Sequence, residues 1–208
     1  MVDHRLYLIF LGAALVLAVT PGPGIFYVLA RTVAGGRREG ILSSLGTFLG
    51  GLVHVLAAAF GLSAILAASA TAFSVVKFAG AAYLVWMGIM MIRTRNAHFD
   101  GKAPTVASLH VFRQGVLTES LNPKTALFFL SLLPQFVNPH LGHAVLQFLV
   151  LGATSVALNT MADLVVTAFA APIGRIMRSN ARFRRNQQVA SGVGMIGLGA
   201  FVAFGEKS

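Results

Sequence analysis

The chain contains no cysteine, and charged residues make up only 11% of its 208 residues. The missing cysteines exclude a disulfide framework, a CxxC redox pair and a thiolate metal site. An ordinary soluble domain has roughly 25% charged residues, whereas this chain is 56% hydrophobic and has a mean hydropathy of +0.78. The composition therefore indicates an integral membrane protein. The length suits about six helices of roughly 20 apolar residues in one domain.

Acidic residues are especially scarce: there are 6 Asp and Glu against 16 Lys and Arg, for a net charge of +10. So few oxygen ligands count against transport of a hard metal cation. Most basic residues follow the first, third and fifth hydrophobic stretches, namely Arg31, Arg37, Arg38, Arg93, Arg95, Lys102, Arg113, Arg175, Arg178, Arg182, Arg184 and Arg185. The positive-inside rule makes these three loops cytoplasmic, so six spans would leave both termini outside. The last basic run fits a solvated loop beside the lipid better than a nucleic-acid site.

We predict an all-α integral membrane fold with six transmembrane helices at about 5–32, 40–66, 73–93, 114–136, 144–171 and 187–205. They form a single membrane transport domain over 1–208, with repeat one at about 5–93, a cytoplasmic loop at 94–113 and repeat two at about 114–205. The first helix is the critical one, because Leu6 to Val19 would extend only about 21 Å against a bilayer core of about 30 Å. It spans only if Ile25 to Ala30 continues it; otherwise five spans remain and the amino terminus lies inside. A cleaved signal peptide after Arg5 is disfavoured because the same pattern recurs around Pro123.

Proline breaks interrupt helices 1 and 4, at Thr20-Pro21-Gly22-Pro23-Gly24 and at Leu121-Asn122-Pro123-Lys124. Backbone groups freed by proline survive in a membrane only where they are buried in protein or line a polar cavity. Each break predicts a half-helix whose amino-terminal N–H groups attract an anion such as a carboxylate. A packing kink is the alternative reading for each break.

The two halves also match each other, with Pro21 paired to Pro123, Gly46 to Gly152 and Gly88 to Gly199. Each repeat has three spans, an odd number, so the two copies would enter the membrane from opposite sides. The prediction is an inverted repeat with a binding site at its centre. The alternative is that glycine- and alanine-rich helices simply resemble one another. Gly46 and Gly50 form a GxxxG pattern, which predicts close helix packing within the bundle.

Few ionisable side chains fall inside the spans, and each is costly to bury there. Asp163 lies near the middle of span five, with Asn159 one turn earlier on the same face. His54 lies at a related depth in span two. Both could carry a proton, since burial favours a neutral carboxyl group and imidazole titrates near neutral pH. The sequence leaves three alternatives for Lys124: it pairs with Glu119 one turn earlier, it extends to the membrane interface, or it binds a substrate carboxylate.

Several motifs resemble the lysine-exporter (LysE/RhtB) family of inner-membrane amino-acid exporters, and together they cover nearly the whole chain. They are TPGPG (20–24), GTFLGGLVHVL followed by FGL (46–62), KFAGAAYLVWMGIMMIR (77–93), LNPKTALFF (121–129) and LPQFV (133–137). The resemblance implies export of an amino acid or a close derivative, driven by the proton motive force. Some members carry an Asp in span two where this chain has Gly51, which makes His54 the nearest ionisable substitute.

The sequence thus predicts a proton-coupled secondary transporter of the inner membrane, with no cofactor, no resident metal and no nucleic-acid partner; a homo-oligomer is left open. The expected substrate-binding residues are Pro21, Gly22, Pro23, Gly24, Asn122, Pro123, Lys124 and Asn159, and the proton-coupling residues are Asp163 and His54. Alternatives are export of another metabolite, such as a homoserine-lactone-like molecule, export of a metal ion, or a non-transporting scaffold. An enzyme is disfavoured, because Ser155 and Asp163 are eight residues apart on a helix that carries no His.

Overall fold

The computed structural model describes residues 4–62, 64, 69–94, 107–138 and 141–204, and all the regular structure in these ranges is helical. The α-helices are α1 (His4–Val19), α2 (Pro23–Ala57), α4 (Ala70–Arg93), α5 (Ser108–Ser120), α6 (Pro123–Leu127), α7 (Ala144–Ala168), α8 (Ala170–Ser179) and α9 (Ala181–Phe204). Two π-helical turns, η1 (Ala58–Leu62) and η2 (Phe128–Leu132), and the 3-10 turn η3 (Leu133–Phe136) complete the described elements. The expectation of an all-α fold is confirmed.

Three of the described helical segments are long and apolar enough to cross a membrane: Pro23–Leu62, Ala144–Ala168 and Ala181–Phe204. Leu6–Val19 is a shorter apolar helix. Large apolar side chains also point outward, including Trp86 at 54% exposure and Phe60 at 64%. An outer surface of this kind suits contact with lipid rather than water.

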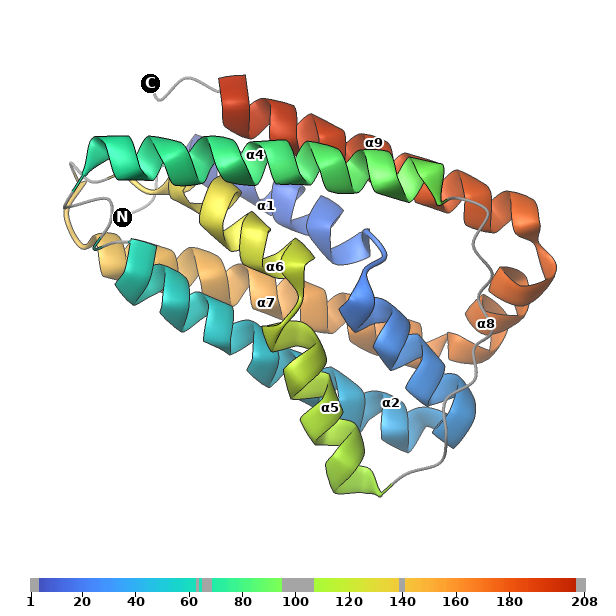
Figure 1. Ribbon diagram of the computed structural model, residues 1–208. Coiled ribbons are helices and arrows are strands. Elements are labelled where there is room, and N and C mark those ends of the chain that lie inside the picture. The colour runs from blue at the N-terminus through green and yellow to red at the C-terminus, as the bar shows by residue number, and fades with distance from the viewer. Residues whose placement is uncertain (1–3, 63, 65–68, 95–106, 139–140, 205–208) are drawn as a thin grey trace.

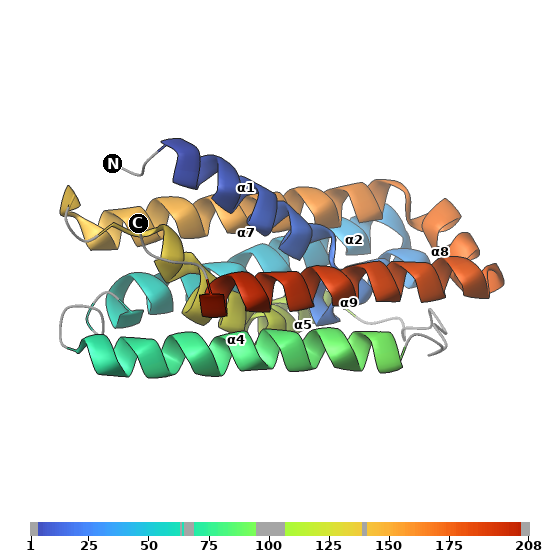
Figure 2. The ribbon, with the colours of Figure 1, turned by 90° about the horizontal axis from the view of Figure 1, so that it is seen from above.

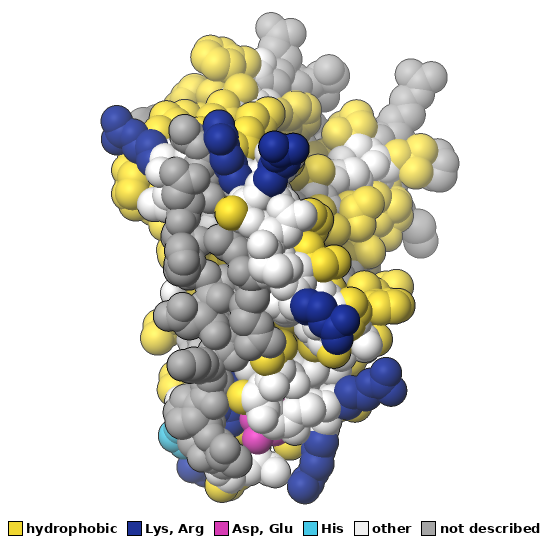
Figure 3. Space-filling model, turned by 90° about the vertical axis from the view of Figure 1, so that its right-hand side faces the viewer, with side chains coloured by type: hydrophobic (Ala, Val, Ile, Leu, Met, Phe, Trp, Pro, Cys, Tyr) yellow, Lys and Arg dark blue, Asp and Glu magenta, His cyan; other side chains and the backbone are white. Residues whose placement is uncertain are grey.

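The helices form an elongated bundle, with α4, α7 and α9 running along its length (Figures 1 and 2). Both termini lie at one end, and α8 lies at the other together with the turn of α2 (Figure 1). Figure 3 looks onto this second end, where Lys and Arg side chains gather. Among the described residues, Lys and Arg side chains are therefore concentrated at this end of the molecule (Figure 3).

α2 consists of two limbs, because its chain reverses at Gly36, which has a φ of 75°. Only glycine adopts this left-handed backbone conformation without strain. The first limb continues the direction of α1 beyond the break, and the second returns along the bundle (Figure 1). The first limb of α2 thus follows the short hydrophobic stretch in the same direction (Figure 1).

Both proline breaks are present, but the first helix restarts at Pro23 rather than Pro21. Gly22 is the N-cap of α2 and Asn122 is the N-cap of α6, so that Pro23 and Pro123 both occupy the first helical position. Proline is favoured there, because the N–H it lacks would have no helical partner. The structural counterpart of Pro123 is therefore Pro23, and the match of Pro21 to Pro123 shifts by two residues.

Helix boundaries differ from expectation at the basic end. α5 begins at Ser108, within the segment 94–113 that was expected to be a loop; residues 95–106 lie outside the described residues. α8 occupies what was expected to be a connection after span five, and α9 begins at Ala181 rather than near 187. These additional turns mix polar and apolar residues, which is why a search for continuous hydrophobic runs passes over them.

Glycines allow close approach in two helix pairs. A Cβ at Gly46 would meet Phe112 O of α5, and one at Gly50 would lie 2.6 Å from Val116 O. A Cβ at Gly88 would lie 2.5 Å from Gly192 O, and one at Gly199 would lie 2.8 Å from Ala81 O, so α4 and α9 pack in the same way. The GxxxG pattern of α2 thus serves packing within the bundle, as predicted.

Candidate functional site

The two proline breaks meet in space, and Lys124 joins them. Its Nζ donates to Leu17 O at 3.1 Å and to Thr20 O at 2.9 Å. Leu17 O lies in the last turn of α1 and also accepts from Thr20 N–H at 3.2 Å, and Thr20 O belongs to the residue after the helix, where C=O groups lack the usual helical partner. Lys124 therefore closes the carboxyl end of α1 with a buried positive charge, which also suits the negative end of the helix dipole.

The start of α6 is closed by its own side chains. Asn122 Oδ1 accepts from the backbone N–H of Lys124 at 3.0 Å, and Asn122 Nδ2 donates to Glu119 Oε2 at 3.0 Å. Thr125 Oγ1 donates to Glu119 Oε1 at 2.6 Å. Glu119 thus accepts from two side chains of the break, while Lys124 bonds to α1. The hydrogen bonds of Lys124 thus go to backbone carbonyls of α1, which the sequence did not predict, and binding of a substrate carboxylate by Lys124 stays a prediction.

The start of α2 is different, because no side chain caps it. Its N-cap residue is Gly22, which has no side chain that could accept a hydrogen bond from the first turn. A Cβ at Gly22 would lie 3.1 Å from the Lys124 side chain, and one at Gly24 would lie 2.5 Å from Glu119 Oε2. Glycine at these positions lets the second break lie against the first. The N-cap of α2 therefore provides no side-chain acceptor, and its first backbone bond runs from Phe26 N–H to Gly22 O at 3.0 Å.

The third wall of the site is α7, which presents Asn159, Thr160 and Asp163. Asp163 is buried, and its Oδ2 accepts from Thr47 Oγ1 of α2 at 2.7 Å. Asn159 lies one turn before Asp163 and is half-buried. The predicted face of span five therefore does point into the bundle, toward the breaks.

These walls enclose a small polar cavity. Its lining residues are Ala18, Gly24, Ile25, Thr47, Gly51, Glu119, Asn122, Lys124, Val156, Asn159, Thr160 and Asp163. The free volume is about 20 Å³, which holds about one water molecule. Sites that enclose small ligands measure roughly 300–1,000 Å³. The cavity is therefore closed around its polar groups and must widen to admit a solute.

The cavity brings together five of the residues predicted from sequence: Gly24, Asn122, Lys124, Asn159 and Asp163. Pro21, Gly22, Pro23 and Pro123 shape the breaks beside it but are not among its lining residues. Thr47, Glu119 and Thr160 also line the cavity and were not among the predicted site residues. Glu119 could have been predicted from the sequence, because an acidic residue in an apolar span one turn before a proline break is costly to bury and therefore marks a candidate site.

His54 lies beside the second break, outside the lining of the cavity. Its Nε2 is 2.9 Å from Glu119 O, and its ring centroid is 5.9 Å from that of Phe129. A carbonyl oxygen only accepts, so Nε2 carries a proton in this contact. His54 thus satisfies a carbonyl at the carboxyl end of α5, as Lys124 does for α1.

The chain matches the family model described as LysE type translocator over residues 15–206. It is 35% identical to a protein of Vibrio cholerae named uncharacterized membrane protein, over 93% of this chain and 97% of that one. It is 30% identical to the homoserine/homoserine lactone efflux protein of Salmonella typhimurium, over 80% of each chain. It is 27% identical to the leucine efflux protein of an Enterobacter species, over 93% of this chain and 90% of that one. No solved structure matches the chain significantly. The chain therefore belongs to the LysE-type translocator family, whose members are membrane-embedded transporters of small molecules such as amino acids and not enzymes.

Proposed function

We propose that this protein exports an amino acid or a close derivative from the cytoplasm across the inner membrane, in exchange for protons. The observation that carries the proposal is the meeting of both proline breaks at one closed cavity that holds Glu119, Lys124 and Asp163. A cavity of this kind, buried between broken helices, is where secondary transporters bind substrate and coupling ion. The efflux proteins among its relatives support the direction of transport.

In the membrane, we propose a multi-pass arrangement of six spans built from two inverted repeats. α1 with the first limb of α2 forms the first span, and α5 with α6 forms the fourth, each broken near its middle (Figure 1). The second limb of α2, α4, α7 and α9 form the other four. The gathering of Lys and Arg at the end that carries α8 supports a cytoplasmic position for this end (Figure 3).

The proposed substrate is a small zwitterion. Its carboxylate binds at the uncapped amino-terminal turn of α2, at Gly24 and Ile25, where backbone N–H groups and the helix dipole favour an anion. Its ammonium group lies toward Asn159 and Asp163 on α7. Pro21, Gly22, Pro23, Asn122, Pro123 and Lys124 act in this proposal by holding the two breaks together. Because Asn122 already caps α6, the second half-helix does not share in binding the carboxylate.

Asp163 is the proposed proton carrier. It lines the cavity and is buried, so its charge is compensated there by few groups other than Thr47 and the nearby Lys124. It would bind a proton from the outside and release it to the cytoplasm once per cycle. His54 is bonded to Glu119 O outside the cavity lining, and its share in proton coupling stays a prediction.

The test is transport by the purified protein in liposomes. An acid interior should drive uptake of labelled leucine or homoserine through molecules inserted with their cytoplasmic side outward. Asp163→Asn should lose this proton-driven accumulation and retain exchange of labelled for unlabelled substrate at equal pH. Accumulation that survives in Asp163→Asn would remove the proton role from this residue. Absence of any leucine, homoserine or homoserine lactone transport by the unaltered chain would refute the proposed function.

The lactone separates two modes of binding at the same site. Homoserine lactone has an ammonium group but no free carboxylate, because its carboxyl carbon is part of the ring. If the amino terminus of α2 binds a carboxylate, homoserine should raise the thermal stability of the detergent-solubilised protein more than its lactone does. An equal or larger effect of the lactone would place recognition on the ammonium side alone.

A further inference from the structure

Buried hydroxyl groups form a row that leads from the cavity toward the basic end of the bundle. Thr47 lines the cavity, and Ser44 follows it one turn along the second limb of α2. Ser44 Oγ lies 3.5 Å from Thr167 Oγ1 of α7, and Thr167 is one turn beyond Asp163. Thr32 of the first limb comes next, since a Cβ at Gly40 would meet both Thr32 and Thr167.

All four side chains are buried, with exposures between 0% for Ser44 and 6% for Thr32. Two of them donate to carbonyls of their own helices, Thr32 to Val28 O at 2.6 Å and Ser44 to Gly40 O at 2.9 Å. The one hydroxyl proton of Thr47 has two acceptors within reach, Ser44 O at 3.0 Å and Asp163 Oδ2 at 2.7 Å. Such bonds satisfy a hydroxyl within its helix and leave its oxygen able to accept from another group. The row is thus a polar surface between helices of an otherwise apolar chain.

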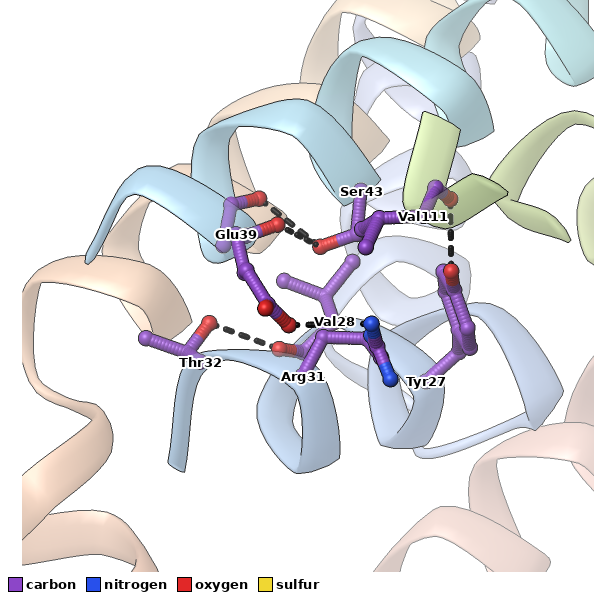
Figure 4. Close-up of polar contacts among 8 residues, drawn as sticks. Tyr27, Val28, Arg31, Thr32, Glu39, Ser43 and Val111 are labelled. Carbon is purple, nitrogen blue, oxygen red and sulfur yellow. Dashed lines mark hydrogen bonds and ion pairs between the residues drawn. The ribbon is translucent and has the colours of Figure 1, made fainter. Parts of the chain in front are cut away.

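The row ends at a buried ion pair. Arg31 Nη2 lies 3.0 Å from Glu39 Oε2, and the two side chains are only 3% and 12% exposed. Arg31 belongs to the first limb of α2 and Glu39 to the second, so the pair joins the limbs across the reversal at Gly36 (Figure 4). Arg31 follows Gly24 by seven residues, about 10 Å along the helix, and Glu39 precedes Thr47 by eight, about 12 Å. The ion pair therefore lies two turns from the cavity, on the side of the basic end.

The surrounding contacts keep this region closed. Tyr27 OH of the first limb donates to Val111 O of α5 at 2.6 Å, and Ser43 Oγ of the second donates to Glu39 O at 2.8 Å (Figure 4). Gly40 lets Thr32 and Thr167 approach the second limb so closely that a methyl group would not fit. The two limbs and α7 therefore touch along this part of the row.

We propose that this row of hydroxyls is the route between the cytoplasm and the cavity, and that the Arg31–Glu39 ion pair is its gate. The proposal rests on the proposed function, and it adds the route and the residues that close it. A buried ion pair suits this role, because its attraction is largely offset by the loss of hydration and weakens once water enters. The small hydroxyls that would then be exposed can hydrogen-bond to both ends of a zwitterion.

The absence of cysteine from the chain gives a clean test by single cysteine substitution. Ser44→Cys changes one atom in the middle of the row. A charged, membrane-impermeant methanethiosulfonate, added to vesicles of defined orientation, should modify it from the cytoplasmic side only. Saturating transported amino acid should slow this modification. Ser131→Cys is the matched control, since Ser131 is equally buried but packs against Gly80 of α4, and it should remain unmodified.

The gate is tested in the same background. Glu39→Gln should raise the rate of modification at Ser44→Cys about tenfold, because the charge attraction that holds the limbs together is lost. The double variant Arg31→Gln/Glu39→Gln removes both charges of the ion pair and should raise the rate of modification by a similar factor. It keeps the test possible if the single variant does not fold. Arg37→Gln removes an exposed charge from the same turn and should change nothing.

Two results would overturn the proposal. One is a Ser44→Cys protein that transports substrate but is never modified from the cytoplasmic side. The other is a rate of modification that is the same with and without the ion pair, which would mean that the hydroxyls serve packing only. In both cases transport itself persists, so failure of the route is distinguished from failure of the proposed function, in which no transport is seen.

Discussion

Lys124 on α6 bonds through its ammonium group to the carbonyl of Thr20, 2.9 Å away at the end of α1 and 104 residues earlier in the chain. The contact fixes the end of one broken helix to the start of the other. It makes Lys124 a structural part of the site, with two of its three ammonium protons donated to backbone carbonyls.

Lys124→Met tests this structural role. Loss of the ammonium group removes the donor to Thr20 O in a buried region and one of the two donors to Leu17 O, which should destabilise the protein by about 2 kcal/mol. Thermal unfolding in detergent measures the change. Lys77→Met is the control, because Lys77 on α4 is half-buried beside the ring of Phe78 and far from the breaks in sequence. Normal stability with lost substrate binding would instead make Lys124 a ligand for the substrate carboxylate.

His54→Gln separates proton coupling from structure at the second break. Glutamine keeps an N–H donor for Glu119 O but cannot titrate, so we expect acid-driven accumulation to persist with little loss of stability. Asp163→Asn, measured in parallel, should lose it. If His54→Gln also abolishes accumulation while exchange continues, His54 belongs to the proton path.

Gly46→Ala or Gly50→Ala should separate α2 from α5. The added methyl group would meet the backbone of α5, at Phe112 O for Gly46 and 2.6 Å from Val116 O for Gly50. The resulting overpacking should lower the free energy of unfolding by about 2 kcal/mol. Gly12→Ala on α1 is the matched control: nothing lies within 4 Å of its added Cβ, so stability should stay equal or rise by up to about 1 kcal/mol.

Gly51→Asp should change which substrates bind. Gly51 lines the cavity, and a Cβ there would lie 3.0 Å from Val156 Cγ2, so the substitution needs the room provided by Val156→Ala. A further carboxylate beside Asp163 and Glu119 favours a substrate with two positive charges. The double variant should be stabilised more by lysine than by leucine, the reverse of Val156→Ala alone. Unchanged preference would show that side-chain selection occurs elsewhere.

The outline of the site was accessible from sequence because its signals are local. A proline within an apolar run predicts a broken helix without any further information. An Asp in the middle of an apolar span, such as Asp163, is costly to bury in a membrane and therefore predicts a functional site. The prediction of one shared site rested on the occurrence of a proline break in each half, and Gly24, Asn122, Lys124, Asn159 and Asp163 do line one cavity.

The remaining details depend on contacts that sequence does not encode locally. Thr47 and Thr160 look like ordinary helical threonines, since each can satisfy its hydroxyl on its own helix, and only the position of α7 gives Thr47 an acid to bind. The partners of Lys124 are backbone carbonyls, which every residue has. α8 went unrecognised because its polar and apolar residues alternate around the helix, so it contains no continuous apolar run.

The single difference between the N-caps at Gly22 and Asn122 gives the two halves unequal roles. Asparagine satisfies the first turn of α6 from within, whereas glycine leaves that of α2 to be satisfied by something else. Two identical halves would accept a zwitterion equally well in either direction. In the proposed binding mode the substrate keeps one orientation, with its carboxylate toward α2 and its ammonium group toward α7. The choice of residue at one N-cap would then decide which way round the substrate is carried.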